Sequence, residues 1–271
     1  MESRTAVVTG AGAGLGFATA KLLREQGWRV FGSVSKRNST EELEKLGVTT
    51  FALNIANYEE TDAFAAFVEE KLDNEGLSAL INVAGISGPG SGLLEGVSPE
   101  NAKLTVDVNL HGTLNMVRSF LPLLRKYGAA RIVNVSSGNL TPAPFTGVYL
   151  VSKFGVEGIT NVLRYEMAPF GIQATSVEPA GMKTNMTKDA EERTKQTWER
   201  MGKTVRDAYY DKINPSLEYM NSVIDSSDEP IDVAKVILKA LNAKKMKIRY
   251  QAKSVAWQLP VWRLLGENGF E

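Results

Sequence analysis

The sequence contains no cysteine and a single histidine, His111. The lack of cysteine excludes disulfide bonds and thiol catalysis, and it fits a cytoplasmic protein. One histidine cannot form a histidine-rich metal site, so we predict no metal centre and a structural role for His111.

Net charge and long apolar runs are also missing. Basic and acidic residues number 31 each among the 271 residues, so no net field favours nucleic acid or an anionic membrane. No stretch approaches the roughly 20 apolar residues of a membrane span. The first apolar run, Thr5–Thr9, starts almost at the initial methionine and leaves no room for a signal peptide. We therefore expect a soluble chain.

Short β-branched runs alternate with longer helical patterns along most of the chain. Hydrophobic residues make up 43% of it, which is ample for a large core. Alternation of this kind is typical of parallel strands joined by right-handed crossovers, with helices on both faces. No repeat or linker divides the chain, so we predict one doubly wound α/β domain spanning residues 1–271. The predicted strands are Thr5–Thr9, Trp28–Val34, Val48–Leu53, Ala79–Val83, Arg131–Ser136 and Ile172–Glu178. The predicted helices are Leu15–Gln26, Thr40–Leu46, Glu59–Asn74, Pro99–Tyr127 and Val148–Phe170.

A glycine-rich turn follows the first predicted strand. It reads Thr9-Gly10-Ala11-Gly12-Ala13-Gly14-Leu15-Gly16 and leads into a helical pattern. Glycines let the backbone turn tightly and approach a pyrophosphate, whose charge then lies at the helix N-terminus. The spacing is T-G-x-x-x-G-x-G rather than G-x-G-x-x-G. Strand, glycines and helix in this order are the context that such a motif needs, so we predict dinucleotide binding.

A tyrosine and a lysine, Tyr149 and Lys153, stand four residues apart in a predicted helix. At that spacing their side chains leave one helix face one turn apart. A neighbouring cation favours phenolate, so we expect the pKa of Tyr149 to lie below its free value of about 10. Such a tyrosine can exchange a proton with a substrate oxygen near neutral pH. Upstream, Ser136 and Ser137 offer hydroxyls that can hydrogen-bond an oxygen on which charge develops.

Together these motifs resemble the short-chain dehydrogenase/reductase family. The resemblance covers roughly residues 5–185, and the family's motifs appear there in the expected order. The motifs that carry it are Thr9–Gly16, Asn82-Val83-Ala84-Gly85, Asn109-Leu110-His111-Gly112, the strand-five serine, Tyr149-x-x-x-Lys153 and the turn after Glu178-Pro179. The stretch Glu178–Met186 and the run Trp28-Arg29-Val30-Phe31 look most like the retinol and 17β-hydroxysteroid dehydrogenase branch.

The resemblance implies a Rossmann fold with a parallel sheet of about seven strands. It also implies an NAD(P)(H)-dependent oxidoreductase that interconverts a secondary alcohol and a ketone or aldehyde by hydride transfer. Tyr149 matches the family's general acid/base, and Lys153 the residue that lowers the tyrosine pKa and holds the nicotinamide ribose. Asn109 matches the asparagine that holds a proton-relaying water chain. The site is predicted to hold no metal.

The serine that orients the substrate oxygen has two candidates. The family's Val-Ser-Ser pattern selects Ser137, whereas the usual distance to the tyrosine selects Ser136. Alternate side chains on a strand face opposite sides, which makes strand registration the firmer guide. We therefore predict Ser137, with one residue deleted in the loop Gly138–Gly147.

Cofactor choice depends on the end of the second predicted strand, Ser33-Val34-Ser35-Lys36-Arg37. Val34 stands where NAD-specific relatives carry an acidic residue, and hydroxyl and cationic groups follow that can bind a 2′-phosphate. This favours NADP(H), with NAD(H) as the alternative if both cations are merely solvated. The residues expected to bind the cofactor are Gly10, Gly12, Gly14, Leu15, Gly16, Ser35, Lys36, Arg37, Asn54, Ile55, Asn82, Ala84, Gly85, Tyr149, Lys153, Pro179 and Thr184.

The last third of the chain carries the substrate and subunit predictions. Residues 185–228 match the family's substrate lid, and their methionines and aromatics suggest a lipophilic alcohol or ketone, with 3-oxoacyl or sugar carbonyl compounds as alternatives. We expect the amphipathic tail, residues 250–271, to pack on its own domain. The alternatives are that it walls the substrate site, contacts another subunit or touches a membrane surface.

The helical patterns Pro99–Tyr127 and Val148–Phe170 resemble those of the family's dimer bundle, so we predict a homodimer or homotetramer. The alternative to an enzyme is a non-catalytic dinucleotide-binding sensor or scaffold of the same fold. A nucleic-acid binder is disfavoured by the neutral charge balance.

Overall fold

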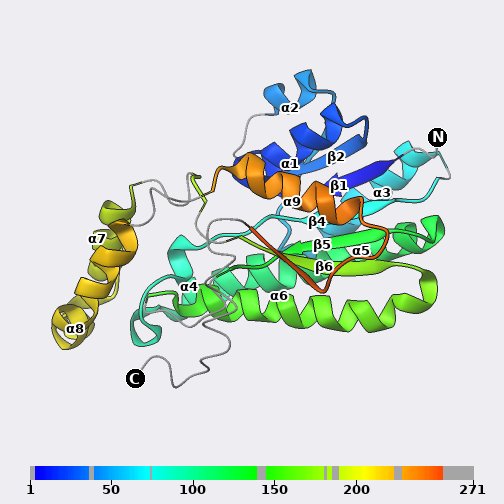
Figure 1. Cartoon of the computed structure of the whole chain (residues 1–271). Coiled ribbons are helices and arrows are strands. Elements are labelled where there is room, and N and C mark those ends of the chain that lie inside the picture. The colour runs from blue at the N-terminus through cyan, green and yellow to red at the C-terminus, as the bar shows by residue number, and fades with distance from the viewer. Residues whose placement is uncertain are drawn as a thin grey trace.

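The structure is a computed structural model that describes residues 4–36, 40–73, 75–138, 145–179, 182–184, 189–222 and 228–252. Its centre is a seven-stranded parallel sheet in the order β3-β2-β1-β4-β5-β6-β7 (Figure 1). The strands are β1 Thr5–Val8, β2 Arg29–Val34, β3 Thr49–Ala52, β4 Ala79–Asn82, β5 Arg131–Val135, β6 Gln173–Glu178 and β7 Arg249–Gln251. The predicted doubly wound α/β fold with a parallel sheet of about seven strands is confirmed.

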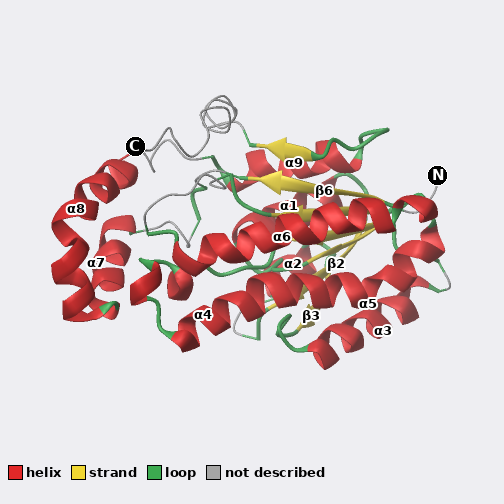
Figure 2. Ribbon diagram, turned by 90° about the horizontal axis from the view of Figure 1, so that it is seen from below, coloured by secondary structure: helices red, strands yellow, loops and turns green. Residues whose placement is uncertain are grey.

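Helices cover both faces of the sheet (Figures 1 and 2). One layer contains α1 and α9, and the other contains α3, α5 and α6. The helices are α1 Gly14–Glu25, α2 Glu41–Lys45, α3 Tyr58–Leu72, α4 Pro99–Val106, α5 Gly112–Tyr127, α6 Gly147–Glu166, α7 Ala190–Arg200, α8 Gly202–Ser222 and α9 Pro230–Leu241. Single-turn 3₁₀ helices lie at Gly88–Gly90, Leu94–Gly96 and Ala168–Phe170.

Strand β1 illustrates how the sequence produces these two layers. Ala6 and Val8 pack in the core beneath α1 and α9, whereas Val7 packs in the core beneath α3 and α5. Successive side chains of a strand point to opposite faces, and both faces here are covered. Both sides of the strand therefore have to be apolar, which explains the hydrophobic run Ala6-Val7-Val8.

Two of the predicted helices are interrupted. The pattern Pro99–Tyr127 contains a π-helical segment, Asp107–His111, between α4 and α5. The pattern Val148–Phe170 ends as an α-helix at Glu166 and finishes in a 3₁₀ turn that contains Pro169. Proline disfavours the helical conformation of the residue before it, which explains the early end. Helix α9 and strand β7 had no counterpart among the predicted ranges.

Helices α7 and α8 lie at the end of the molecule opposite the N-terminus (Figures 1 and 2). They form a small apolar cluster around Trp198, Met201, Val205 and Leu217. Among the described residues, no helix is both long and apolar enough to span a membrane.

Candidate active site

The glycine turn after β1 has the geometry that a dinucleotide needs. Gly10 and Gly14 have positive φ values of 66° and 52°, which other residues adopt at a cost. A Cβ on Gly16 would lie 2.1 Å from the Gly10 carbonyl oxygen, so only glycine allows the turn to close against α1. Ala13 precedes the helix and makes no side-chain cap, which leaves the first N–H groups of α1 to a ligand. The turn fits a pyrophosphate.

The segment after β4 is held against this turn. Thr9 Oγ1 accepts hydrogen bonds from the backbone N–H groups of Val83 at 2.9 Å and Ala84 at 3.0 Å. A Cβ on Gly85 would lie 3.1 Å from Asn109 Oδ1 and 3.4 Å from Lys153 Nζ. Residues 82–85 therefore join the glycine turn to the predicted catalytic groups.

Tyr149 and Ser137 meet at the carboxyl end of β5. The side chain of Ser137 is hydrogen-bonded to the Tyr149 phenol. Ser136 is buried, and its Oγ has no hydrogen-bond partner among the described residues. The structure thus brings Ser137, not Ser136, to the tyrosine. Most of the loop in which a deletion was predicted, residues 139–144, lies outside the described residues.

The expected pKa of Tyr149 is wrong for this structure. Burial raises the pKa above its ordinary value, and the hydrogen bond to Ser137 offsets this only in part. Lys153 Nζ donates a hydrogen bond to the Val135 carbonyl at 2.9 Å and lies 5.9 Å from the centre of the Tyr149 ring. Burial and Ser137, rather than this cation, set the direction of the Tyr149 pKa shift. Burial also lowers the pKa of Lys153 to about 8. Both shifts follow from desolvation of the charged forms.

Asn109 is fully buried in the π-helical segment between α4 and α5. Its amide Nδ2 donates to the Ile86 carbonyl at 2.8 Å and to Ser152 Oγ at 3.0 Å. Its Oδ1 accepts from the Ile86 N–H at 2.8 Å. The Asn109 side chain therefore links the segment after β4 to Ser152 of α6, the residue before Lys153. The π-helical segment was not predicted, and short π segments often occur at functional sites.

The residues predicted to distinguish NADP from NAD lie beyond β2 and β3. Ser35 and Lys36 are exposed at the surface, and Lys36 Nζ forms an ion pair with Glu60 Oε1 at 3.0 Å. Glu60 also accepts from the Asn54 N–H at 2.8 Å, and hydrogen bonds from Asn54 and Lys36 hold its pKa below the ordinary value. Arg37 lies outside the described residues. Lys36 thus has a carboxylate partner that the sequence did not reveal.

The remaining predicted cofactor residues border the same turn. Pro179 follows β6, and its carbonyl accepts a hydrogen bond from the Gly138 N–H at 2.5 Å. A Cβ on Gly14 would lie 3.4 Å from Thr184 Cγ2, so the segment after β6 reaches the start of α1. Ile55 is buried after β3 and accepts from Asn115 Nδ2 at 3.1 Å. The site therefore draws on the carboxyl ends of β1 to β6, where open α/β sheets bind ligands.

Comparison with known proteins places the chain in a family. A family model described as short chain dehydrogenase matches residues 4–195. The chain belongs to the short-chain dehydrogenase family. D-beta-hydroxybutyrate dehydrogenase, mitochondrial, of Bos taurus is 32% identical over 278 residues, which cover 95% of this chain and 79% of that protein. The mouse (Mus musculus) 17-beta-hydroxysteroid dehydrogenase type 6 is 34% identical over 215 residues, covering 77% and 67% of the two chains. A short-chain dehydrogenase structure from Streptomyces avermitilis has a TM-score of 0.80 at 25% identity, covering 99% and 94%.

The predicted family and its hydroxysteroid dehydrogenase branch are confirmed by these matches. The chain is accordingly an NAD(P)-dependent oxidoreductase of the class that acts on CH–OH groups. Sequence reasoning missed Ser152 as a partner of Asn109, and it missed Glu157 one helical turn beyond Lys153. The available signal was the spacing of these residues along the buried face of α6.

Proposed function

We propose that this short-chain dehydrogenase reduces a lipophilic ketone or aldehyde to the alcohol, with Tyr149 as the acid that protonates the substrate oxygen. The observation that carries the proposal is the hydrogen bond between Ser137 and Tyr149, with the buried Lys153 alongside them. A phenol whose pKa is raised is protonated at neutral pH, which is the form a proton donor needs.

The residues of this site divide the reaction between them. Ser137 orients the carbonyl oxygen, and Tyr149 transfers its proton to that oxygen as the carbonyl carbon becomes an alcohol carbon. Lys153 and Asn109 reconnect Tyr149 to solvent so that the phenol regains its proton. When bound, the nicotinamide supplies the hydride. The protein supplies orientation and electrostatic stabilisation.

The proposed substrate class rests on the apolar groups around α7 and α8, the described part of the predicted lid. Trp198 stacks at a tilt on Phe145, four residues before Tyr149, with ring centres 4.7 Å apart. Met201 packs against the turn 92–96, where a Cβ on Gly96 would lie 2.5 Å from its Cγ. The lid thus places aromatic and thioether surface close to the segment that carries Tyr149. A hydroxybutyrate dehydrogenase among the relatives makes a small 3-oxo acid the alternative substrate.

An assay that compares cofactors and carbonyl substrates tests this proposal. We expect the purified protein to consume NADPH with ketones from a panel of steroid, retinoid, 3-oxo acid and sugar carbonyl compounds, and to prefer NADPH to NADH. Ser35 and Lys36 carry the preference, because no carboxylate follows β2 directly to repel a 2′-phosphate. The measurement is the loss of reduced-nicotinamide absorbance. Consumption of neither cofactor with any class would leave the non-catalytic sensor as the better proposal, and a preference for NADH would overturn the cofactor choice.

We also propose that the chain assembles as a homodimer or homotetramer through the layer of α4, α5 and α6. The outer face of α6 carries Val151, Phe154, Val162 and Tyr165, which are 56%, 48%, 53% and 81% exposed. Their spacings of three, eight and three residues keep them on one face of the helix, where they form an apolar stripe. An exposed apolar stripe of this kind supports an interface between subunits.

A charge within that stripe is expected to separate the subunits. In size-exclusion chromatography with light scattering, Val162→Glu should run as a monomer and the parent as a dimer or tetramer, because a buried unpaired carboxylate is costly. Ile231→Glu is the matched control, because Ile231 is 37% exposed on α9 in the opposite layer. A monomeric parent would contradict the predicted assembly. The predicted cytoplasmic location and single-domain organisation stay predictions.

A further inference from the structure

A row of polar side chains crosses the sheet beneath α6. Asn82 of β4 is the ladder partner of Asn134 of β5, which pairs with Ser176 of β6, which pairs with Arg249 of β7. Ladder partners project from the same face of a sheet, and Asn134 Nδ2 donates to Thr160 Oγ1 of α6 at 2.9 Å. The row therefore lies against α6. We call it, with Ser136, Glu178 and the α6 residues Lys153, Glu157 and Thr160, the polar seam.

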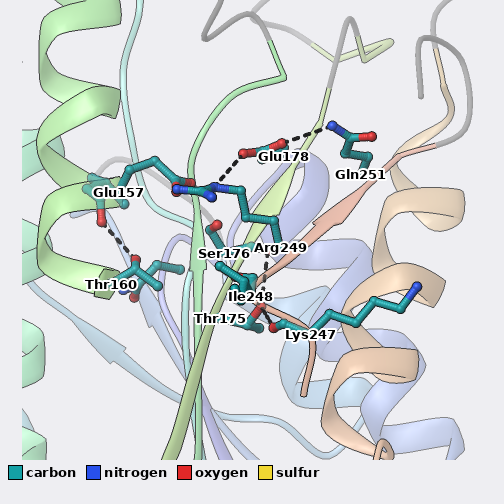
Figure 3. Close-up of polar contacts among 11 residues, drawn as sticks. Glu157, Thr160, Thr175, Ser176, Glu178, Lys247, Ile248, Arg249 and Gln251 are labelled. Atoms are coloured by element: carbon teal, nitrogen blue, oxygen red, sulfur yellow. Dashed lines mark hydrogen bonds and ion pairs between the residues drawn. The ribbon is translucent and has the colours of Figure 1, made fainter. Parts of the chain in front are cut away.

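One guanidinium holds two carboxylates at the edge of the polar seam (Figure 3). Arg249 Nε lies 2.8 Å from Glu157 Oε2 and 3.2 Å from Glu178 Oε1. Both glutamates are buried, and the arginine is about one-third exposed. Glu178 also accepts from Gln251 Nε2 at 3.4 Å. The cluster joins α6, β6 and β7, which are far apart in the chain, and fixes the Glu157 carboxylate inside the protein.

Four buried polar atoms in or beside the polar seam have no hydrogen-bond partner among the described residues. They are Asn82 Oδ1, Ser136 Oγ, Ser176 Oγ and Glu157 Oε1. A buried polar atom without a partner is expensive, so such atoms in native proteins usually bind ordered water. The gathering of four of them on one face, with polar groups of several elements, is the environment that holds water molecules. The second oxygen of Glu157 is thus available to water.

The polar seam begins at the active site. Lys153 donates to the carbonyl of Val135, the residue before Ser136. Glu157 follows Lys153 by four positions on the buried face of α6, so the two side chains are neighbours on that face. No described carboxylate lies within 4.0 Å of Lys153 Nζ. On α6, Glu157 is the carboxylate closest in sequence to Lys153, so a link between the two side chains would run through water.

We propose that Glu157 is a positioning residue for catalysis: its carboxylate, anchored by Arg249 and linked to Lys153 through water in the polar seam, keeps the Tyr149–Lys153 pair protonated. The inference rests on the proposed function of that pair. The charged and titratable groups that face the polar seam are Tyr149, Lys153 and Glu157 on α6, Glu178 on β6 and Arg249 on β7. Strand β5 and the π-helical segment contribute amides and hydroxyls from Asn134, Ser136 and Asn109.

The expected pH effect has a definite sign. Carbonyl reduction needs the phenol and the ammonium, so activity falls when the pair loses a proton. A nearby negative charge raises the proton affinity of both groups, and its removal lowers both macroscopic pKa values. Glu157→Gln should therefore move the alkaline limb of kcat/KM to lower pH. We expect a shift of about one pH unit, equivalent to about 1.4 kcal/mol of interaction between the carboxylate and the pair.

The test compares three variants of the full-length protein. Profiles of kcat/KM against pH are measured with NADPH and the best ketone of the panel, together with the pH dependence of NADPH affinity by fluorescence. Glu157→Gln should shift the alkaline limb, and Glu157→Asp, which keeps the charge, should restore it towards the parent. Thr175→Val is the control, because it removes buried hydrogen bonds to the Lys247 and Ile248 carbonyls on the opposite face of β6 without changing charge. It should lower the melting temperature and leave the limb in place.

Two outcomes would overturn the inference. One is a Glu157→Gln profile that superimposes on the parent profile, or one that Thr175→Val reproduces, since either would show that the cluster only stabilises the fold. The other is a high-resolution crystal structure of the parent with no ordered water on Glu157 Oε1 or Ser136 Oγ, a result that needs no variant to fold. Both differ from failure of the proposed function, in which Tyr149→Phe would turn over like the parent.

Discussion

Replacing Tyr149 by phenylalanine is expected to lower kcat for ketone reduction by about 10³-fold, within the range of about 10²–10⁴ that a positioned general acid contributes. The substitution removes the proton that the substrate oxygen needs and keeps the ring that packs beneath Lys153. NADPH affinity and KM should change little, because the phenol acts on the reacting oxygen rather than on the bulk of either ligand.

The control for this variant is Tyr58→Phe. Tyr58 starts α3, where its ring stacks with Arg118, and hydrogen bonding to Asp62 raises the pKa of its phenol. Tyr58 thus also has a phenol with a raised pKa, but it lies far along the chain from the site. Removing its hydroxyl should leave kcat at the parental value. Stopped-flow absorbance at the reduced-nicotinamide band measures both variants. Parental turnover by Tyr149→Phe would exclude Tyr149 as the acid, and a different group would have to protonate the substrate oxygen.

Replacing Gly16 by alanine is expected to abolish detectable NADPH binding, a loss of at least about 100-fold in affinity, equivalent to roughly 2.7 kcal/mol. The added Cβ would lie 2.1 Å from the oxygen and 2.5 Å from the carbon of the Gly10 carbonyl. Backbone atoms cannot rotate away as a flexible side chain can, so the glycine turn has to move from the start of α1. That movement separates the N–H groups that would bind the pyrophosphate.

Gly27→Ala is the matched control for Gly16→Ala. Gly27 follows the far end of α1, and a Cβ there meets no heavy atom within 4 Å. Its φ is 78°, which alanine adopts only at a cost, so this variant should unfold at a lower temperature and still bind NADPH normally. Calorimetric titration with NADPH and thermal unfolding distinguish the two glycines. Normal binding by Gly16→Ala would show that the turn does not contact the dinucleotide.

Local chemistry explains why much of the fold and part of the site can be predicted from the sequence. The run Ala6–Val8 is apolar at every position because both faces of β1 are covered. Gly16 cannot be replaced by a larger residue, because a Cβ there would clash with the Gly10 carbonyl in the same short segment. Ser137 lies two residues beyond the end of β5, and its hydrogen bond to Tyr149 matches the Val-Ser-Ser pattern rather than the usual distance to the tyrosine.

Contacts between distant segments account for what the sequence did not show. The partner of Lys36 is Glu60, 24 residues further on, and that of Glu157 is Arg249, 92 residues further on. The direction of the Tyr149 pKa shift also needed coordinates, because burial outweighs a lysine whose Nζ is held by a backbone carbonyl instead of by the phenol. The tail from residue 253 onwards lies outside the described residues, so its predicted role is untested.

The sequence by itself determined the parallel α/β architecture, because strands and helices alternate along the chain. It also determined the glycine turn and the placement of Tyr149 and Lys153 on one helix, because each depends on residues within one or two turns of chain. Only the tertiary structure decided which charges meet and how strongly each titrating group is desolvated. Those quantities depend on separations in space and on the loss of water, and neither is encoded in spacing along the chain.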